Sequence, residues 1–173
     1  MHRLHLLSLA LLLMFGSAAS AQGWMAFSPE GGRYKIEMPG VPQVGTSTVS
    51  GANGNNLMTE AVVQLRGATY IASYVDYPER VSTIHSTDVI LDRARDGMAS
   101  GNTIRGEQKI TAGRTAGREF VIVEKNGNVN AIRIYWSRNR LYTLVVTGRT
   151  GIESQPDTRR YFDSFAVLRP PAT

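Results

Sequence analysis

One histidine lies beyond the first 21 residues, and the side chains around it have the types that hydrolysis or metal binding requires. Asp76, Glu79 and Asp88 lie within nine positions of His85, and Ser82 and Ser86 flank it. The sequence has no Gly-x-Ser-x-Gly turn to present a serine nucleophile, and a lone histidine cannot build the usual histidine-rich metal site. Ser86 or Thr87 is equally explained as a helix N-cap. A hydrolase centred on His85 is therefore kept as an alternative.

A second group of interest combines two arginines with two tyrosines on consecutive strands. A guanidinium group presents a planar fork of N–H donors, so these arginines could bind a carboxylate, a phosphate or an acidic partner. A structural explanation competes with this one: Arg133 could stack on Phe120 and pair with a nearby carboxylate. The predicted ligand-binding residues are Arg118, Arg133, Tyr135 and Tyr142.

The grouping of these four residues depends on two hairpin turns. Asn126-Gly127 is a strong hairpin signal because both residues tolerate positive φ, and Arg138-Asn139 is the next expected turn. With two-residue loops at both places, Arg118 faces Tyr135 across one strand pair and Tyr135 faces Tyr142 across the next. A register shift of one residue would scatter the group over both faces of the sheet.

The composition excludes several classes of function. The chain has no cysteine, which rules out thiol catalysis, disulfide exchange and cysteine-ligated zinc. Its formal net charge is +5, yet the basic residues are spread along the chain, and no nucleic-acid motif accompanies them. The glycine-rich stretches lack both the phosphate-loop and the dinucleotide spacing. We predict no cofactor, no metal and no nucleic-acid partner; net positive charge favours anionic head groups or cell-wall polymers.

The first 21 residues have the pattern of a secretory signal peptide. Arg3 supplies a charged start, residues 6–15 form an apolar run, and Ala19-Ser20-Ala21 is a small-x-small cleavage site. An uncleaved anchor is the alternative, but the run is shorter than the roughly 20 residues of a spanning helix. We therefore expect a signal peptide over 1–21 and one domain over 22–173. The protein would be exported by a bacterium, either to the periplasm or out of the cell, with no stable membrane insertion after cleavage.

The rest of the chain has the periodicity of a β-rich domain interrupted by one clear helix. Both faces of the strands from 115 to 147 are mostly apolar, so the sheet should be covered on both sides. We predict an α+β fold, an antiparallel sheet covered by two helices and the N-terminal strands. The expected helices lie within 83–100 and 157–163, and the expected strands span 24–27, 34–38, 44–49, 58–65, 68–77, 108–110, 115–125, 128–137, 140–147 and 165–168.

Four short motifs resemble the PsbP-like family of small exported proteins, including its DcrB-like bacterial members. They are the run from Tyr34 to Pro42, Gly117 to Phe120, Arg140 to Tyr142, and Phe162 to Phe165. The resemblance spans most of the chain after residue 21 and implies a PsbP-like α/β sandwich. Its motifs are structural and none is catalytic. The photosynthetic role of some members does not carry over, because the sequence shows no thylakoid context.

Three functions follow as hypotheses. The first is a non-enzymatic exported protein that binds or helps to assemble an envelope protein partner, as the resemblance implies. The second is a small anionic ligand-binding protein, with a pocket under one helix and Arg118 or Arg133 as the anion anchor. The third is the hydrolase centred on His85. The sequence leaves the partner and the oligomeric state open.

Overall fold

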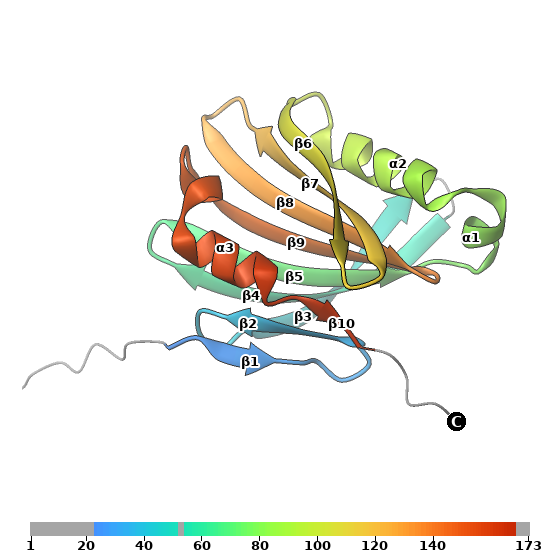
Figure 1. Ribbon diagram of the computed structural model, residues 1–173, viewed down its shortest axis with the longest axis horizontal. Coiled ribbons are helices and arrows are strands. Elements are labelled where there is room, and N and C mark those ends of the chain that lie inside the picture. Colours follow the sequence, from blue (N-terminus) through green and yellow to red (C-terminus); the bar gives the residue numbers. More distant parts are fainter. Residues whose placement is uncertain (1–22, 52–53, 169–173) are drawn as a thin grey trace, which may run out of the picture.

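A seven-stranded antiparallel sheet forms the centre of the protein (Figure 1). The computed structural model describes residues 23–51 and 54–168. The predicted signal peptide, residues 1–21, lies outside the described residues, so its cleavage stays a prediction. The strands, in their order across the sheet, are β3 (Gln43–Gly51), β4 (Gly54–Leu65), β5 (Ala68–Asp76), β9 (Arg140–Arg149), β8 (Asn128–Ser137), β7 (Thr115–Val123) and β6 (Thr103–Ala112).

One face of the large sheet is covered by a small second sheet and by the C-terminal helix (Figure 1). In β2, Tyr34, Ile36 and Met38 are buried and Lys35 is exposed, which is the alternation that directs one side of a strand into a core. Pro156 lies in the first turn of α3. Backbone N–H groups in the first turn have no acceptor within the helix, so proline removes no hydrogen bond there. The covering elements are β1 (Met25–Phe27), β2 (Tyr34–Met38), η1 (Ile152–Ser154), α3 (Pro156–Asp163) and β10 (Ala166–Val167).

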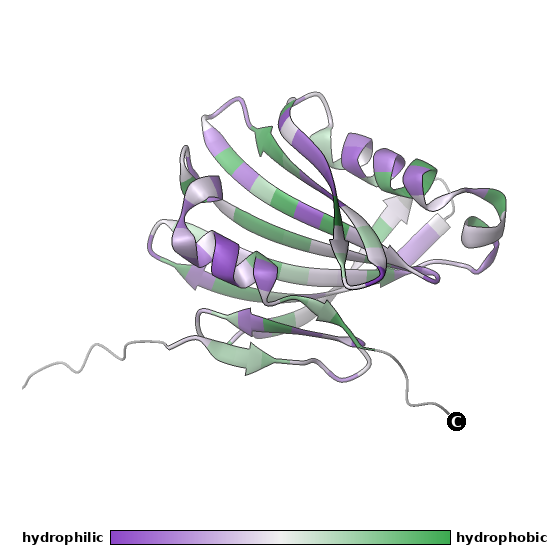
Figure 2. Cartoon of the chain, viewed as in Figure 1, coloured by the Kyte–Doolittle hydropathy of each residue, from purple (hydrophilic) through white to green (hydrophobic). Residues whose placement is uncertain are grey.

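The other face is covered in part by helix α2 (Thr87–Ala99), which follows the short helix α1 (Arg80–Ile84). Ser86 caps α2 because its side chain accepts a hydrogen bond from the Val89 N–H at 3.4 Å. Leu91 is fully buried against the sheet. Helix α2 contacts β7 and β8. Figure 2 shows hydrophobic stripes along these strands beneath a helix whose outer surface is mostly hydrophilic.

The structure confirms the α+β class and the two-sided cover of the sheet. Strand β8 has the predicted bounds, and Ser86 is the predicted N-cap. Strand β6 is much longer than the expected 108–110, and it pairs with β7 on both sides of a bulge. The prediction was too short because most residues of β6 are exposed and polar and show little strand periodicity. No helix within the described residues is long and apolar enough to cross a membrane.

The predicted register between β7 and β8 is wrong by one residue. The Asn126-Gly127 hairpin has a three-residue loop, in which the Gly127 N–H donates to the Glu124 carbonyl and Gly127 takes a positive φ of 85°. This is a type I turn followed by a left-handed glycine, which adds one residue to the loop. Arg118 consequently faces Ile134 instead of Tyr135.

The predicted two-residue turn at Arg138-Asn139 is confirmed. Together with the shifted β7–β8 register, it places Arg118 on one face of the sheet and the other three residues on the opposite face. Tyr135 pairs with Tyr142 and Arg133 with Leu144, as a two-residue turn at 138–139 requires. Because a shift of one residue reverses every side chain of a strand, Arg118 lies on the face of α2. Arg133, Tyr135 and Tyr142 lie on the face covered by α3 and the small sheet.

Candidate functional site

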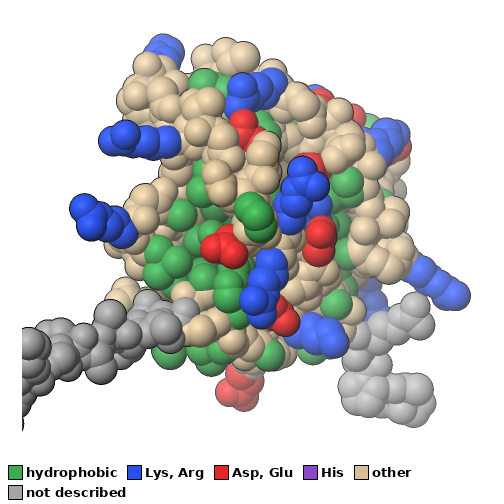
Figure 3. Space-filling model, turned by 60° about the vertical axis from the view of Figure 1, so that its left-hand side comes forward, with side chains coloured by type: hydrophobic (Ala, Val, Ile, Leu, Met, Phe, Trp, Pro, Cys, Tyr) green, Lys and Arg blue, Asp and Glu red, His purple; other side chains and the backbone are tan. Residues whose placement is uncertain are grey.

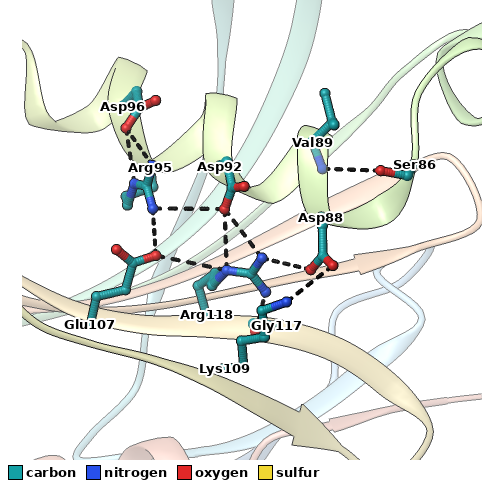
Figure 4. Close-up of polar contacts among 10 residues, drawn as sticks. All are labelled: Ser86, Asp88, Val89, Asp92, Arg95, Asp96, Glu107, Lys109, Gly117 and Arg118. Carbon is teal, nitrogen blue, oxygen red and sulfur yellow. Dashed lines mark hydrogen bonds and ion pairs between the residues drawn. The ribbon is translucent and has the colours of Figure 1, made fainter.

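Arg118 lies beneath helix α2 and is held by three carboxylates (Figure 4). Its side chain is 4% exposed. It donates to Asp88 at 2.6 Å and to Asp92 at 3.2 Å, and Glu107 lies 3.7 Å away. Burial works against the positive charge, but the hydrogen bond and charge of the aspartates outweigh it, so the pKa of Arg118 is raised. The guanidinium group is thus occupied by internal partners.

Further ion pairs extend this network along the flank of α2 that faces β6. Arg95 pairs with Glu107 at 2.5 Å and with Asp96 at 2.8 Å, and Lys109 of β6 pairs with Asp88 at 3.1 Å. Hydrogen bonds from Arg118 and then Lys109 lower the pKa of Asp88. The result is a charged seam between one flank of α2 and strands β6 and β7.

Arg133 lies on the opposite face, where it is also paired. It bonds to Glu119 and, at 2.8 Å, to Asp163, and its guanidinium carbon lies 4.9 Å from the centre of the Phe162 ring. Burial opposes its charge, and the ion pairs with Asp163 and Glu119 prevail, so its pKa is raised. The structure therefore shows the stacked and paired arrangement that the sequence offers as an alternative, on Phe162 instead of Phe120.

The two tyrosines of the predicted group are part of the core. Tyr135 stacks on Phe165 with the ring centres 4.9 Å apart, and Tyr142 meets the same ring edge-on at 5.6 Å. Both tyrosines are 2% exposed. Most of the surface of each ring is therefore covered by core contacts.

Four of the residues around His85, namely Asp76, Ser82, Ser86 and Asp88, are engaged elsewhere. The Ser82 hydroxyl donates to the Arg138 carbonyl, and Ser86 caps α2. Asp76 is bound by Arg140 and Arg33, whose hydrogen bonds and charges lower its pKa. The Nε2 atom of His85 lies 2.9 Å from Nη1 of Arg93, which must be the donor because a guanidinium has no acceptor.

Sequence reasoning missed the main hollow of this face, a half-open apolar cleft of about 590 Å³ on the other flank of α2. Its volume lies within the usual range of ligand sites. The ends of β3 and β4 pass behind α2 in Figure 1, and they form the wall opposite the helix. The sheet floor of this cleft, which we call the α2 hollow, consists of Ser73, Val75, Trp136, Leu141 and Thr143.

Small residues on α2 keep this space open. Ala94 and Gly97 line the hollow together with Ile90 and Met98, and a Cβ atom added at Gly97 would meet nothing within 4 Å. The opposite wall contains Val49, Ser50 and Met58. No sequence motif marks these residues, since they are ordinary apolar and small side chains from distant segments.

Arg93 is the charged residue that lines the α2 hollow, and His85 and Tyr77 are the other titratable residues there. Arg93 forms no ion pair with any carboxylate of the described residues, and its one hydrogen-bond partner there is His85. The imidazole accepts this bond, so no carboxylate of the described residues offsets the guanidinium of Arg93 beside the apolar cleft. This arrangement suits an anionic group whose attached apolar part enters the hollow.

Side chains of different kinds are mixed on one face of the molecule. On the face shown in Figure 3, basic side chains project around the rim, and basic, acidic and hydrophobic side chains alternate in the middle. Within residues 23–51 and 54–168, no group of three or more histidine, aspartate or glutamate side chains could hold a metal ion.

Comparison with known proteins identifies no family for this chain. No family model and no curated protein matches the sequence. Among solved structures, the chain is similar to the crystal structure of PA94, a protein of unknown function from Pseudomonas aeruginosa. The identity is 10% and the TM-score 0.39, and the match covers 87% of this chain and 99% of that one. The function must therefore be argued from this chain's own residues.

Proposed function

We propose that this chain is an exported, non-enzymatic binding protein and that its ligand site is the α2 hollow. The observation that carries the proposal is a half-open apolar cleft of about 590 Å³ with an arginine at its side that has no carboxylate partner among the described residues. Export rests on the signal-peptide pattern of residues 1–21. The finer fold, a PsbP-like sandwich, rests on the resemblance of the motifs from Tyr34 to Phe165.

The proposed ligand is a small amphipathic anion, an aliphatic chain that carries a carboxylate. Its chain would lie on Val75, Trp136 and Leu141, and removal of this apolar surface from water would drive binding. Its carboxylate would accept hydrogen bonds from the fork of Arg93. This retains the ligand-binding hypothesis of the sequence but replaces Arg118 and Arg133, which are occupied, with Arg93.

The contacts of His85 favour binding over hydrolysis. A serine hydrolase requires a hydrogen bond between the nucleophile and the histidine base. Here Ser82 and Ser86 bond to backbone groups, and the Nε2 atom of His85 is taken by Arg93. These contacts support a role for His85 in positioning the arginine.

A protein partner is a second candidate, and the edge strand β3 favours it. This strand has nine residues and no charged side chain, and Val44 is exposed. The opposite edge, β6, carries a bulge between Arg105 and Gln108 and an exposed lysine, which are common protections against strand pairing. An extended segment of an envelope protein could add to β3 by backbone hydrogen bonds.

Dodecanoate provides the test of the ligand proposal, with Trp136 as the reporter. Trp24→Phe leaves Trp136 as the remaining tryptophan of the chain, so its fluorescence reports on the floor of the hollow. We expect a saturable change on titration with dodecanoate below its micelle concentration. Arg93→Ala should weaken binding about tenfold through the lost charged hydrogen bonds. Arg149→Ala, an exposed arginine outside the hollow, is the matched control and should bind normally.

A pair of glycine variants locates the ligand. Gly97→Leu should fill the hollow and abolish the titration, whereas Gly97→Ala adds one methyl group and should leave most of the affinity. The ligand proposal is wrong if dodecanoate leaves Trp136 fluorescence unchanged, or if Gly97→Leu binds as well as Gly97→Ala.

The protein-partner candidate has its own experiment. Because the chain has no cysteine, Thr48→Cys places a single crosslinker on the β3 edge and Thr111→Cys places one on the β6 edge. A partner on β3 should crosslink in the envelope from position 48 and not from position 111. The second change Thr46→Lys should abolish that adduct by placing a charge on the edge; equal adducts from both edges would contradict the candidate.

A further inference from the structure

Three arginines line a second pocket. It lies where the turn between β6 and β7 and the turn between β8 and β9 meet the segment around β10. It has a volume of about 400 Å³ and includes Arg33, Arg114 and Arg138. Arg114 belongs to the turn between β6 and β7, Arg138 to the turn between β8 and β9, and Arg33 directly precedes β2. Figure 1 shows these two turns beside β10. Phe165 and Tyr142 contribute to its apolar lining.

Most of the donors of these arginines are unused. The side chains of Arg114 and Arg138 make no hydrogen bond or ion pair with other described residues. Arg33 uses its Nη2 atom for Asp76 at 3.1 Å, which leaves its other N–H groups available. This contrasts with Arg118, Arg133 and Arg140, each of which is bound by at least one carboxylate. Three guanidinium groups therefore share one pocket with few internal partners.

The backbone at two of these arginines is in an unfavourable conformation. Three non-glycine residues of the described chain have positive φ, and Arg33 (56°) and Arg138 (58°) are two of them. Glycine would adopt this conformation without strain. The Arg138 carbonyl accepts from Ser82, and the Arg33 carbonyl accepts from the Leu168 N–H at 2.8 Å, so tertiary contacts hold both positions. Arginine at strained turn positions points to a use for its side chain.

We propose that this arginine pocket binds a phosphate group. A phosphate has several acceptor oxygens that can take N–H bonds from more than one planar fork, and arginine is the side chain best shaped for such contacts. The same chemistry is offered by a free phosphate compound and by the head group of an anionic phospholipid. The proposal is independent of the α2 hollow, because no residue lines both pockets.

Titration with inorganic phosphate at constant ionic strength, followed by amide chemical shifts, tests the site. We expect saturable shifts at the turns that contain Arg114 and Arg138. Arg138→Gly and Arg114→Ala should each weaken phosphate binding about tenfold or more. Arg149→Ala removes the same charge from an exposed position outside the pocket and should leave the affinity unchanged.

Arg138→Gly also separates binding from folding. Glycine fits the positive φ of this turn, so the variant should keep or raise its melting temperature while it loses phosphate. The proposal is overturned if the shifts do not saturate, if they spread over all arginines, or if Arg149→Ala weakens binding as much as Arg138→Gly does.

Vesicles distinguish the two sources of phosphate. If the ligand is a lipid head group, the protein should float with phosphatidylglycerol vesicles and not with phosphatidylcholine vesicles. Arg114→Ala and Arg138→Gly should abolish flotation while Arg149→Ala preserves it. Saturable phosphate binding without flotation assigns the pocket to a free phosphate compound. The proposal is wrong if both pocket variants still float and the phosphate shifts do not saturate. In that case the net positive charge of the protein alone would explain its binding to vesicles.

Discussion

The two flanks of helix α2 differ in every respect that matters for binding. On the β6 side, Asp88, Asp92 and Arg95 join Arg118 and Glu107 in a charged seam, and the open hollow of about 410 Å³ there is lined by charged and polar side chains. On the β4 side, Ala94 and Gly97 face an apolar cleft of about 590 Å³. One helix is thus fixed to the sheet along one flank and leaves space along the other. A firmly held wall can line a preformed site, which lowers the ordering cost of binding a ligand.

The largest expected effect follows from breaking the charged seam. Arg118→Ala removes a buried guanidinium and leaves three carboxylates close to one another, so we expect a loss of about 2–4 kcal/mol in the free energy of unfolding. Urea unfolding measures this loss. Lys109→Ala is the matched control, because its pair with Asp88 is exposed and should contribute less than about 0.5 kcal/mol. Similar losses in the free energy of unfolding for the two variants would show that the charged seam does not stabilise the packing of α2 on the sheet.

On the flank of α2 that lines the hollow, we expect a substitution that stabilises the protein. Gly97 lies inside a helix and a Cβ atom there meets open space, so Gly97→Ala should raise the free energy of unfolding by about 0.5–1 kcal/mol. Thermal and urea unfolding report the gain. A destabilised Gly97→Ala protein would mean that the hollow closes on α2 in solution.

Acid should loosen the charged seam. Hydrogen bonds from Arg118 and Lys109 lower the pKa of Asp88 in the folded state. Stability from this group is therefore complete above the unfolded pKa of about 3.9 and is lost as pH falls through the lower folded value. Asp88→Asn should lower stability at pH 7 and flatten the decline between about pH 5 and 2. Urea unfolding across this range tests the slope, and an unchanged slope would contradict the assignment.

The smallest expected effect on stability is at the side of the hollow. Arg93 is exposed and bonds to His85 alone among the described residues, so Arg93→Ala should change the free energy of unfolding by less than about 0.5 kcal/mol. Its effect should appear in dodecanoate affinity instead. A large loss of stability would make Arg93 a structural residue and weaken the ligand proposal.

Local patterns predicted the strands and the covering of the sheet well. The alternation over β2 and the apolar faces of β8 and β9 are visible in the sequence, because a strand between two layers must be apolar on both sides. The three-residue loop at Asn126-Gly127 was not predicted. Such a dipeptide can serve two-residue and three-residue hairpins, so it does not by itself set the register that the structure shows.

The candidate site could not be predicted in the same way. The sequence identified arginines by their chemistry, but whether a guanidinium is free depends on which carboxylates lie beside it in space. Arg118 is bound by aspartates 26 and 30 residues away, and Arg133 by Asp163, 30 residues away. Nothing in the local sequence of Arg93 shows that it lacks a carboxylate partner among the described residues. Its availability follows from the position of α2 alone.

The sequence by itself determined the α+β class, the β-rich core and the N-cap of α2, because these depend on periodicity and on contacts within a few residues. The tertiary structure decided which arginines are occupied, how the β7–β8 hairpin closes and where free volume remains. These properties depend on distances between segments far apart in the chain. A one-residue difference in one loop was enough to separate Arg118 from Arg133 by the thickness of the sheet.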